Sequence, residues 1–307
     1  MGRGRRSPKG FKDVNGILLL DKPLGISSNK ALQAARNIFK ANKAGHTGSL
    51  DPLATGLLPV CFGEATKYSG YLLDSSKSYR ANCKLGITTT TGDGEGDVVT
   101  ERPVNVSRDM LDEVISQFIG KINQIPPMYS AVKHKGERLY ALARKGIEVE
   151  RKSREIEIFE LEVLSFEGDQ LELYVHCSKG TYIRTLAEDM GEQLGCGAYL
   201  TGLERTGVQP FWDAKSYTMD ELRGISDSEE QNLNDILLPI ESALTDWPQV
   251  ELTTDMSFYL LQGQAVQVAK APTQGLVRLV DEVKGFIGLG VILSDGRVSP
   301  KRMMREI

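Results

Sequence analysis

Apolar and polar positions along the first part of the chain predict short strands separated by helices. The run Gly16–Leu20 is continuously apolar, which predicts a buried strand, and Asp21-Lys22-Pro23 ends it. Ser27 or Ser28 can cap a helix, because apolar residues recur after it at helical spacing up to Phe39. The apolar residues 57–62 predict a second strand.

Alternating and helical patterns continue through the middle of the chain. Residues 78–85 alternate and predict a strand with Tyr79, Ala81, Cys83 and Leu85 on one face. Ser107 can cap a helix that ends at Gly120. Residues 155–164 and 171–177 predict a hairpin, and a further helix opens near Ser178 or Thr181 and ends at Gly195.

The apolar runs become shorter towards the C-terminus. The acidic segment within residues 225–250 predicts a surface helix, followed by a domain boundary near Trp247-Pro248. Beyond it, short apolar runs separated by turns predict a small β-barrel or sandwich, with strands at 263–268, 275–280, 285–293 and 297–298.

Composition narrows the class of protein. With 307 residues, of which 40% are hydrophobic, the chain can bury one large core or two. It contains no run of eighteen apolar residues and no signal-peptide pattern, so we expect a soluble, cytoplasmic protein. The four cysteines are far apart, which favours reduced thiols, and with only three histidines a metal site is disfavoured.

The net charge of −4 conceals an uneven distribution. Residues 1–80 and 121–154 are both rich in Lys and Arg, and together they indicate a local phosphate-facing surface. For either block alone, a solvated tail or a charged loop is the favoured interpretation. Residues 1–13 predict a flexible basic arm. In 121–154 aromatic residues alternate with cations, a pattern that suits looped RNA, although an exposed helical hairpin would also explain it.

Two stretches hold candidate chemistry. Residues 45–56 combine glycines with His46 and with Asp51 among leucines, which predicts a loop that is either catalytic or an Asx-type turn. Arg184 falls in the first turn of a predicted helix, where its charge opposes the helix dipole, so we expect an anionic partner such as a phosphate or Asp51. The acidic spacing of residues 86–97 imitates a calcium loop, but Val104 stands where the loop needs glutamate, and calcium is excluded.

The sequence from about Gly16 to the C-terminus resembles the TruB family of tRNA pseudouridine synthases. The resemblance rests on GHTGSLDPLATGLLP, DKPLGISS, SKGTYIRT, GFIGLG and DGRVSPKR. It implies an α+β pseudouridine-synthase fold, in which a mostly antiparallel mixed sheet is flanked by helices, over residues 14–247. It also implies a small C-terminal β-barrel of the PUA type over residues 248–307, and isomerisation of uridine 55 in the tRNA T-loop without cofactor or metal.

The same resemblance assigns roles to individual residues. Asp51 is the essential carboxylate, Arg184 the active-site arginine and Tyr79 the active-site tyrosine that stacks on the base. The implied substrate-binding residues are His46, Tyr182, Leu203, Lys22 and Lys67, although a strand-end lysine with a structural role is an equally good interpretation of Lys22. The insertion at about 123–153 corresponds to a thumb that clamps the T-arm of tRNA. We expect a monomer that needs no partner protein and no membrane.

Other functions stay open at this point. An RNA-binding or RNA-folding protein would use residues 45–56 structurally. A guide-dependent relative of dyskerin would share the chemistry, but such relatives lack the thumb. A glycosidase would need a second carboxylate near Asp51, for which Glu64 is the nearest candidate in sequence. The enzyme hypothesis requires Asp51 and Arg184 to meet in a sheltered hollow that accepts an everted pyrimidine.

Overall fold

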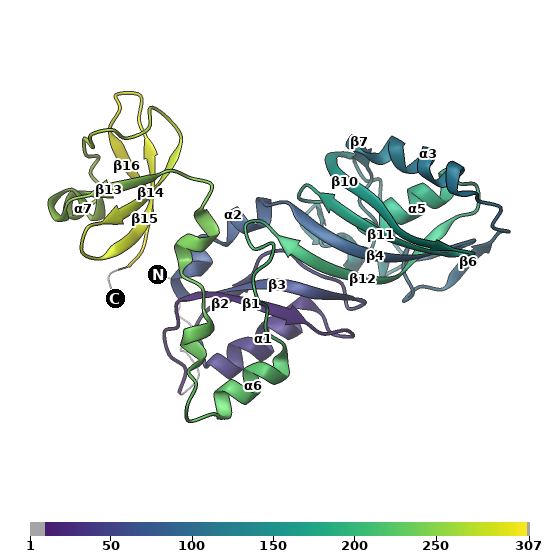
Figure 1. Cartoon of the computed structure of the whole chain (residues 1–307), viewed down its shortest axis with the longest axis horizontal. Coiled ribbons are helices and arrows are strands. Elements are labelled where there is room, and N and C mark those ends of the chain that lie inside the picture. The colour runs from purple at the N-terminus through teal and green to yellow at the C-terminus, as the bar shows by residue number, and fades with distance from the viewer. Residues whose placement is uncertain (1–9, 306–307) are drawn as a thin grey trace.

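The structure is a computed structural model that describes residues 10–305. Its main sheet has eight strands, in the order β1-β3-β12-β4-β11-β10-β7 with β2 paired to β3 (Figure 1). All pairs in it are antiparallel except β12 with β3, among the described residues. The bounds are β1 (Gly16–Lys22), β2 (Ala44–His46), β3 (Ala54–Phe62), β4 (Lys77–Leu85), β7 (Gly120–Gln124), β10 (Arg154–Glu167), β11 (Gln170–Cys177) and β12 (Ala198–Val208). The predicted mostly antiparallel mixed sheet is confirmed.

Helices cover the sheet in two groups, each with its own core. At one end of the sheet, α1 (Ser28–Phe39) and α6 (Met219–Asp227) bury apolar residues against β1 and β3. At the other end, α3 (Arg108–Phe118) and α5 (Ile183–Gln193) pack on β4, β10 and β11 (Figure 1). Between β3 and β4 the chain forms η1 (Gly63–Lys67) and α2 (Ser69–Asp74). The predicted caps Ser27 and Ser107 both accept a main-chain hydrogen bond in the first turn of α1 and α3.

Two segments of the chain extend from the main sheet. The first is the hairpin β5 (Ile87–Thr89) and β6 (Val98–Glu101). The second, which we call the thumb, spans residues 125–153 and contains β8 (Lys133–His134), β9 (Glu137–Arg138) and α4 (Leu139–Ala143). Gln124 and Arg154 are paired neighbours in β7 and β10, so the thumb begins and ends at one point of the sheet edge.

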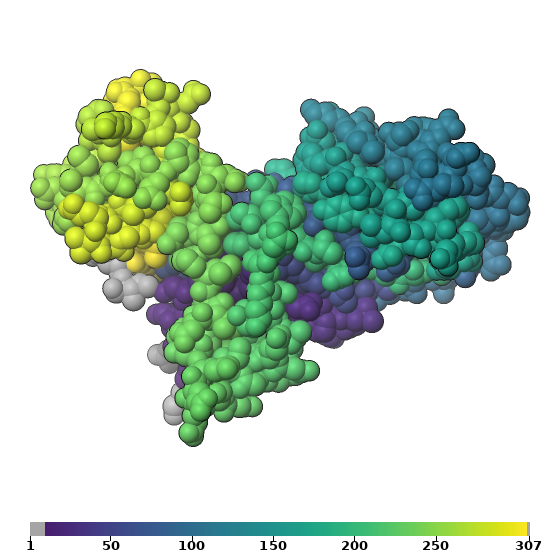
Figure 2. Space-filling view, viewed as in Figure 1, coloured from purple at the N-terminus to yellow at the C-terminus, as the bar shows by residue number. Residues whose placement is uncertain are grey.

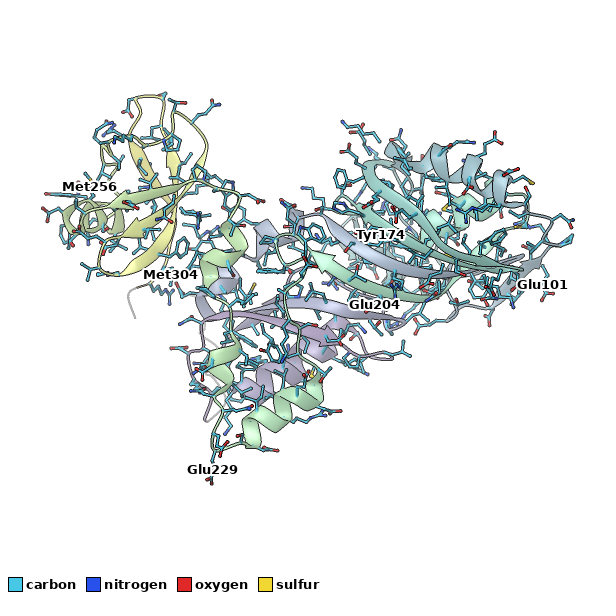
Figure 3. All side chains as sticks on the ribbon, viewed as in Figure 1. Glu101, Tyr174, Glu204, Glu229, Met256 and Met304 are labelled. Atoms are coloured by element: carbon cyan, nitrogen blue, oxygen red, sulfur yellow. The ribbon has the colours of Figure 1, made fainter. Side chains whose placement is uncertain are left out.

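The C-terminal part forms a separate four-stranded sheet in the order β13-β14-β15-β16, with its own buried core. The bounds are β13 (Gln249–Leu252), α7 (Thr254–Leu261), β14 (Leu276–Asp281), β15 (Gly285–Ile292) and β16 (Val298–Met303). Figure 2 shows it as a lobe of its own, separated by a depression in the surface from the lobe around β10 and α3. Met304 lies at the junction with the main domain (Figure 3) and packs on its core, while the Tyr68 hydroxyl donates to the Arg302 carbonyl at 3.0 Å.

Several local predictions are wrong. The expected helix within residues 225–250 is absent, since α6 ends at Asp227 and the segment forms the short η2 (Leu233–Ile236) and η3 (Ile240–Leu244). Residues 263–268 form only an isolated bridge, Val266 to Val298. In the predicted flexible arm, residues 1–9 lie outside the described residues, but Lys12 is bound through its main chain to Lys40 and Asn42. No helix between residues 10 and 305 combines the length and apolar character of a membrane span.

Candidate active site

Asp51 lies on a connection between β2 and β3 that is shorter than the predicted loop, because both ends of that stretch join strands. Its neighbour Leu50 is fastened to the first turn of α1: the Ser28 hydroxyl accepts from the Leu50 amide at 2.7 Å and donates to the Leu50 carbonyl at 2.9 Å. A turn bond from the Ala54 amide to the Asp51 carbonyl, at 3.1 Å, starts β3. The position of Asp51 is therefore fixed on both sides by buried contacts.

The structure brings Asp51 and Arg184 together. Arg184 is in the first turn of α5, and its Nη2 lies 2.9 Å from Asp51 Oδ2. The arginine side chain is 6% exposed, whereas the Asp51 side chain is 46% exposed. The cation is thus held by the protein, while the carboxylate faces an open side from which a substrate can approach.

Arg184 has three further partners. Its Nε lies 3.5 Å from Asp93 Oδ2, Nη1 donates to the Thr91 carbonyl at 2.9 Å, and Nη2 donates to the Tyr129 carbonyl in the thumb at 2.8 Å. Asp93 is almost fully buried, and its place in this cluster was not predicted from the sequence. The available signal was an acid flanked by Gly92, Gly94 and Gly96 in the stretch rejected as a calcium loop.

These charges act on Asp51 in opposite directions. Burial raises the pKa of Asp51, Arg184 lowers it, and the negative charge of Asp93 raises it again, so that the pKa is above its ordinary value.

Lys22, fully buried at the end of β1, donates to the Pro23 carbonyl at 2.9 Å. Burial lowers the pKa of Lys22 to about 8, although Asp51 and Glu95 act in the other direction.

Three other predicted residues come from strands around this centre. Tyr79 is buried in β4, and its neighbouring strand residue Ala81 pairs with Leu203 of β12. Leu203 also pairs with Ala54, where β3 leaves the Asp51 loop. His46 ends β2, and burial lowers its pKa, which favours the neutral imidazole. Its Nδ1 is buried without a hydrogen-bond partner among the described residues.

Comparison with known proteins assigns this arrangement to a family. Residues 36–183 match the model of the "TruB family pseudouridylate synthase (N terminal domain)", and residues 184–245 and 248–304 match two TruB C-terminal models. The chain is 52% identical to the "tRNA pseudouridine synthase B" of Nitrosococcus oceani, over 95% of this chain and 96% of that protein. It is 48% identical to the protein of the same name from Yersinia pestis, over 100% and 96%.

The chain belongs to the TruB family of pseudouridine synthases. It is therefore an isomerase. Among solved structures, the Cbf5-Nop10-Gar1 complex contains a chain with a TM-score of 0.71 and 25% identity, over 99% of this chain and 91% of that one. The Cbf5 chain of an archaeal box H/ACA Nop10-Cbf5 complex, at 24% identity and a TM-score of 0.70, shows the same fold.

In this TruB-family enzyme, Tyr182 occupies the N-cap of α5, where Ser178 or Thr181 was predicted. It makes no side-chain cap bond. Instead the buried Gln124 amide accepts from the Tyr182 main-chain nitrogen at 2.8 Å and donates to its carbonyl at 3.0 Å. Since Gln124 stands at the base of the thumb, the thumb and the helix that carries Arg184 share one anchor.

Lys67 is not part of the cluster around Asp51. It lies in η1, and its Nζ is 2.5 Å from Glu64 Oε2 and donates to the Met303 carbonyl at 3.0 Å. Glu64 also accepts from the Arg305 main-chain nitrogen at 2.7 Å. Both residues therefore fasten the C-terminal sheet to the main domain.

The expected hollow for a pyrimidine stays a prediction. A cleft lined by Thr91, Tyr129, Thr185 and Glu188 lies on the thumb side of Arg184, and Asp51 is not among its lining residues. Between residues 10 and 305 no group of His, Cys, Asp and Glu could hold a metal ion, and the four cysteines are buried free thiols. The chemistry available here is that of a carboxylate oriented by a buried guanidinium beside a tyrosine.

Proposed function

We propose that this pseudouridine synthase acts on tRNA and converts uridine 55 of the T-loop to pseudouridine, with Asp51 as the reacting carboxylate. The observation that carries the proposal is the 2.9 Å contact between Arg184 Nη2 and Asp51 Oδ2, with Tyr79 and Leu203 on the adjoining strands. Relatives that are half identical over nearly the whole chain are named tRNA pseudouridine synthase B.

The reaction sets specific chemical requirements. Uracil leaves the ribose C1′, rotates, and is rejoined through C5, without redox change or net hydrolysis. A carboxylate must act near the sugar, the detached base must be held, and the C5 proton must be accepted. Asp51 supplies the carboxylate, and Arg184 keeps it ionised and oriented, because an opposite charge favours the charged form.

The remaining candidates hold the RNA. Tyr79 stacks on the everted base, Leu203 shields it, His46 and Tyr182 line the approach, and the buried Lys22 supports the site from the end of β1. Eversion of the uridine from the T-loop costs a few kcal/mol. Exposed cations of the thumb, such as Lys133 and Arg138, can offset that cost through phosphate contacts.

The domain assignments belong to the same proposal. Residues 14–247 form the catalytic domain, and residues 248–307 form a PUA-like RNA-binding domain. The enzyme works as a cytoplasmic monomer. Its thumb binds the substrate RNA, a role for which guide-dependent relatives use partner molecules.

A tritium-release assay tests the proposal. The protein is incubated, in EDTA and without cofactor, with an unmodified tRNA transcript labelled at uridine C5. We expect stoichiometric release from the wild type, none from a transcript with cytidine at position 55, and loss of at least about a thousandfold in rate for Asp51→Asn with unchanged tRNA affinity. Release that is independent of position 55 contradicts the specificity, and an active Asp51→Asn variant contradicts the role of Asp51.

A further inference from the structure

Arg205 is a buried cation outside the cluster formed by Asp51, Arg184 and Asp93. Its side chain in β12 is 2% exposed. Its Nε donates to the Leu57 carbonyl at 2.6 Å and its Nη2 to the Gly48 carbonyl at 3.3 Å. Within the described residues it forms no ion pair with a carboxylate, and its partners are neutral. Burial of a charge without a counter-ion is costly, and an apolar side chain would fill the same space at lower cost.

The position of Arg205 in the sheet shows what this charge faces. β12 lies between β3 and β4, and Arg205 pairs with Gly56 on one side and with Tyr79 on the other. Side chains alternate along a strand, so Arg205 is on the face opposite to Glu204, which is exposed on the outer face (Figure 3). Directly paired residues place their side chains side by side on one face. The guanidinium therefore lies next to the Tyr79 phenol.

Arg205 also holds the loop that carries Asp51 by hydrogen bonds to its main chain. Gly48 precedes Asp51 on that loop and Leu57 follows it in β3, and Arg205 binds the carbonyls of both. At Gly56 the two strands approach so closely that a Cβ would lie 2.4 Å from the Arg205 carbonyl oxygen. One side chain thus connects Tyr79 with both ends of the loop that carries Asp51.

We propose that Arg205 is a positioning residue for the isomerisation, which fixes the Tyr79 hydroxyl and stabilises its anionic form as the acceptor of the C5 proton. The proposal rests on the function proposed above, in which Tyr79 faces the target base. In a site shielded from water, a tyrosine anion needs a nearby positive charge, and Arg205 supplies that charge to Tyr79.

The proton transfer is balanced without a further reactant. Tyr79 first ionises by release of its proton to solvent. After C5 has bonded to C1′, the C5–H bond breaks and its proton goes to the Tyr79 oxygen. The electron pair of that bond forms the C5–C6 double bond, the N1–C6 π pair moves to N1, and N1 takes a proton from water.

Burial and nearby charges act on the Tyr79 phenol in opposite directions, and together they leave its pKa above the ordinary value. Burial raises the pKa of Tyr79, whereas the charge of Arg205 and its hydrogen bond to the phenol lower it. Asp51 and the Cys177 thiol act with burial. Loss of the positive charge at position 205 must therefore raise the pKa of Tyr79 further.

The first test is a direct titration of Tyr79 in the full chain, which requires no turnover. Tyrosine labelled with carbon-13 at Cζ reports ionisation by NMR, and Tyr79→Phe identifies the signal. Arg205→Gln removes the charge but retains a donor, Arg205→Lys retains the charge, and Arg223→Gln, an exposed residue of α6, is the control. We expect Tyr79 to titrate at higher pH in Arg205→Gln only. Equal titration in Arg205→Gln and Arg205→Lys overturns the proposal.

The second test is kinetic and separates this proposal from the function on which it rests. We expect Arg205→Gln to reduce single-turnover conversion at pH 7.5 by about 10- to 100-fold with unchanged tRNA affinity, and to show a primary isotope effect with 5-deuterouridine that the wild type lacks. A reduced rate without an isotope effect or a shift in the pH profile overturns the role of Arg205. Absence of conversion by the wild type contradicts the proposed function instead, and leaves the titration of Tyr79 as the measure of the Arg205–Tyr79 contact.

Discussion

Arg184 Nη2 lies 2.9 Å from Asp51 Oδ2 and donates from the same nitrogen to the Tyr129 carbonyl of the thumb. A cation 6% exposed therefore contacts both the carboxylate proposed to react and the base of the segment proposed to bind RNA. Asp93, in the β5–β6 hairpin, is a further charged partner of Arg184. A shift of the thumb changes a contact of Arg184, so the proposed RNA clamp and the proposed reacting carboxylate share one side chain.

The pH dependence of the rate follows from these contacts. In its proposed role Asp51 must be ionised, so we expect activity above its pKa and a loss of activity as the pH falls through it. Arg184→Met removes the charge that lowers this pKa, and we expect the acid limb of the rate profile to move to higher pH. Asp93→Asn removes a repulsive charge and should move the limb to lower pH. Single-turnover tritium release, followed from acid to neutral pH until the rate no longer rises, measures both shifts. An acid limb that moves in the same direction in both variants contradicts the assignment.

Gly56 should be intolerant of a side chain for a steric reason. Its φ is +92°, and a Cβ would lie 2.4 Å from the Arg205 carbonyl oxygen. Gly120 has the same φ of +92°, but nothing lies within 4 Å of its Cβ position. The left-handed backbone costs both alanine variants about 1–2 kcal/mol, and the clash adds about 1–3 kcal/mol in Gly56→Ala alone. Urea unfolding measures the difference, and equal losses would refute the close approach of β12 to β3.

Exposed cations of the thumb should contribute to tRNA affinity through phosphates. We expect Lys133→Gln and Lys135→Gln each to weaken binding, and each to reduce the slope of log affinity against log salt by roughly one, because one phosphate fewer is neutralised. Filter binding of unmodified tRNA across a range of KCl concentrations provides the measurement. Arg223→Gln on α6 is the control of equal charge change. A slope that is equally reduced in the control would show a general charge effect and no specific binding of phosphate by the thumb.

Lys67 allows a test between direct RNA binding and a role at the domain junction. Because Glu64 and Lys67 bind each other and the C-terminal sheet, we expect Lys67→Met and Glu64→Gln to weaken tRNA binding by similar factors of about three to ten, equivalent to about 1 kcal/mol. Both variants should also be cleaved faster by protease near Trp247. Weaker binding in Lys67→Met alone, with unchanged proteolysis, would instead support a direct contact between Lys67 and RNA.

Much of the secondary structure could be predicted because its signals are local. Ser27 and Ser107 cap their helices as expected, and Tyr79, Ala81, Cys83 and Leu85 share one buried face. The prediction failed where a distant partner replaces the local signal. Tyr182 begins α5 without a capping side chain because Gln124, from the edge strand, binds its main chain. Residues 263–268 lacked a partner strand and formed only one bridge.

The sequence by itself determined that the chain alternates strands and helices, that its motifs resemble one family, and that Asp51 and Arg184 are unusual in their local settings. Hydrophobic periodicity, capping and helix-dipole effects act over a few residues, so they can be read from neighbours in the chain. Only the tertiary structure decided that Arg184 also binds Asp93 and the thumb, that Lys67 fastens the C-terminal sheet, and that Arg205 is buried beside Tyr79. Those choices depend on strand order and register, which bring distant residues within a few ångströms and remove them from water, where charge interactions become strong.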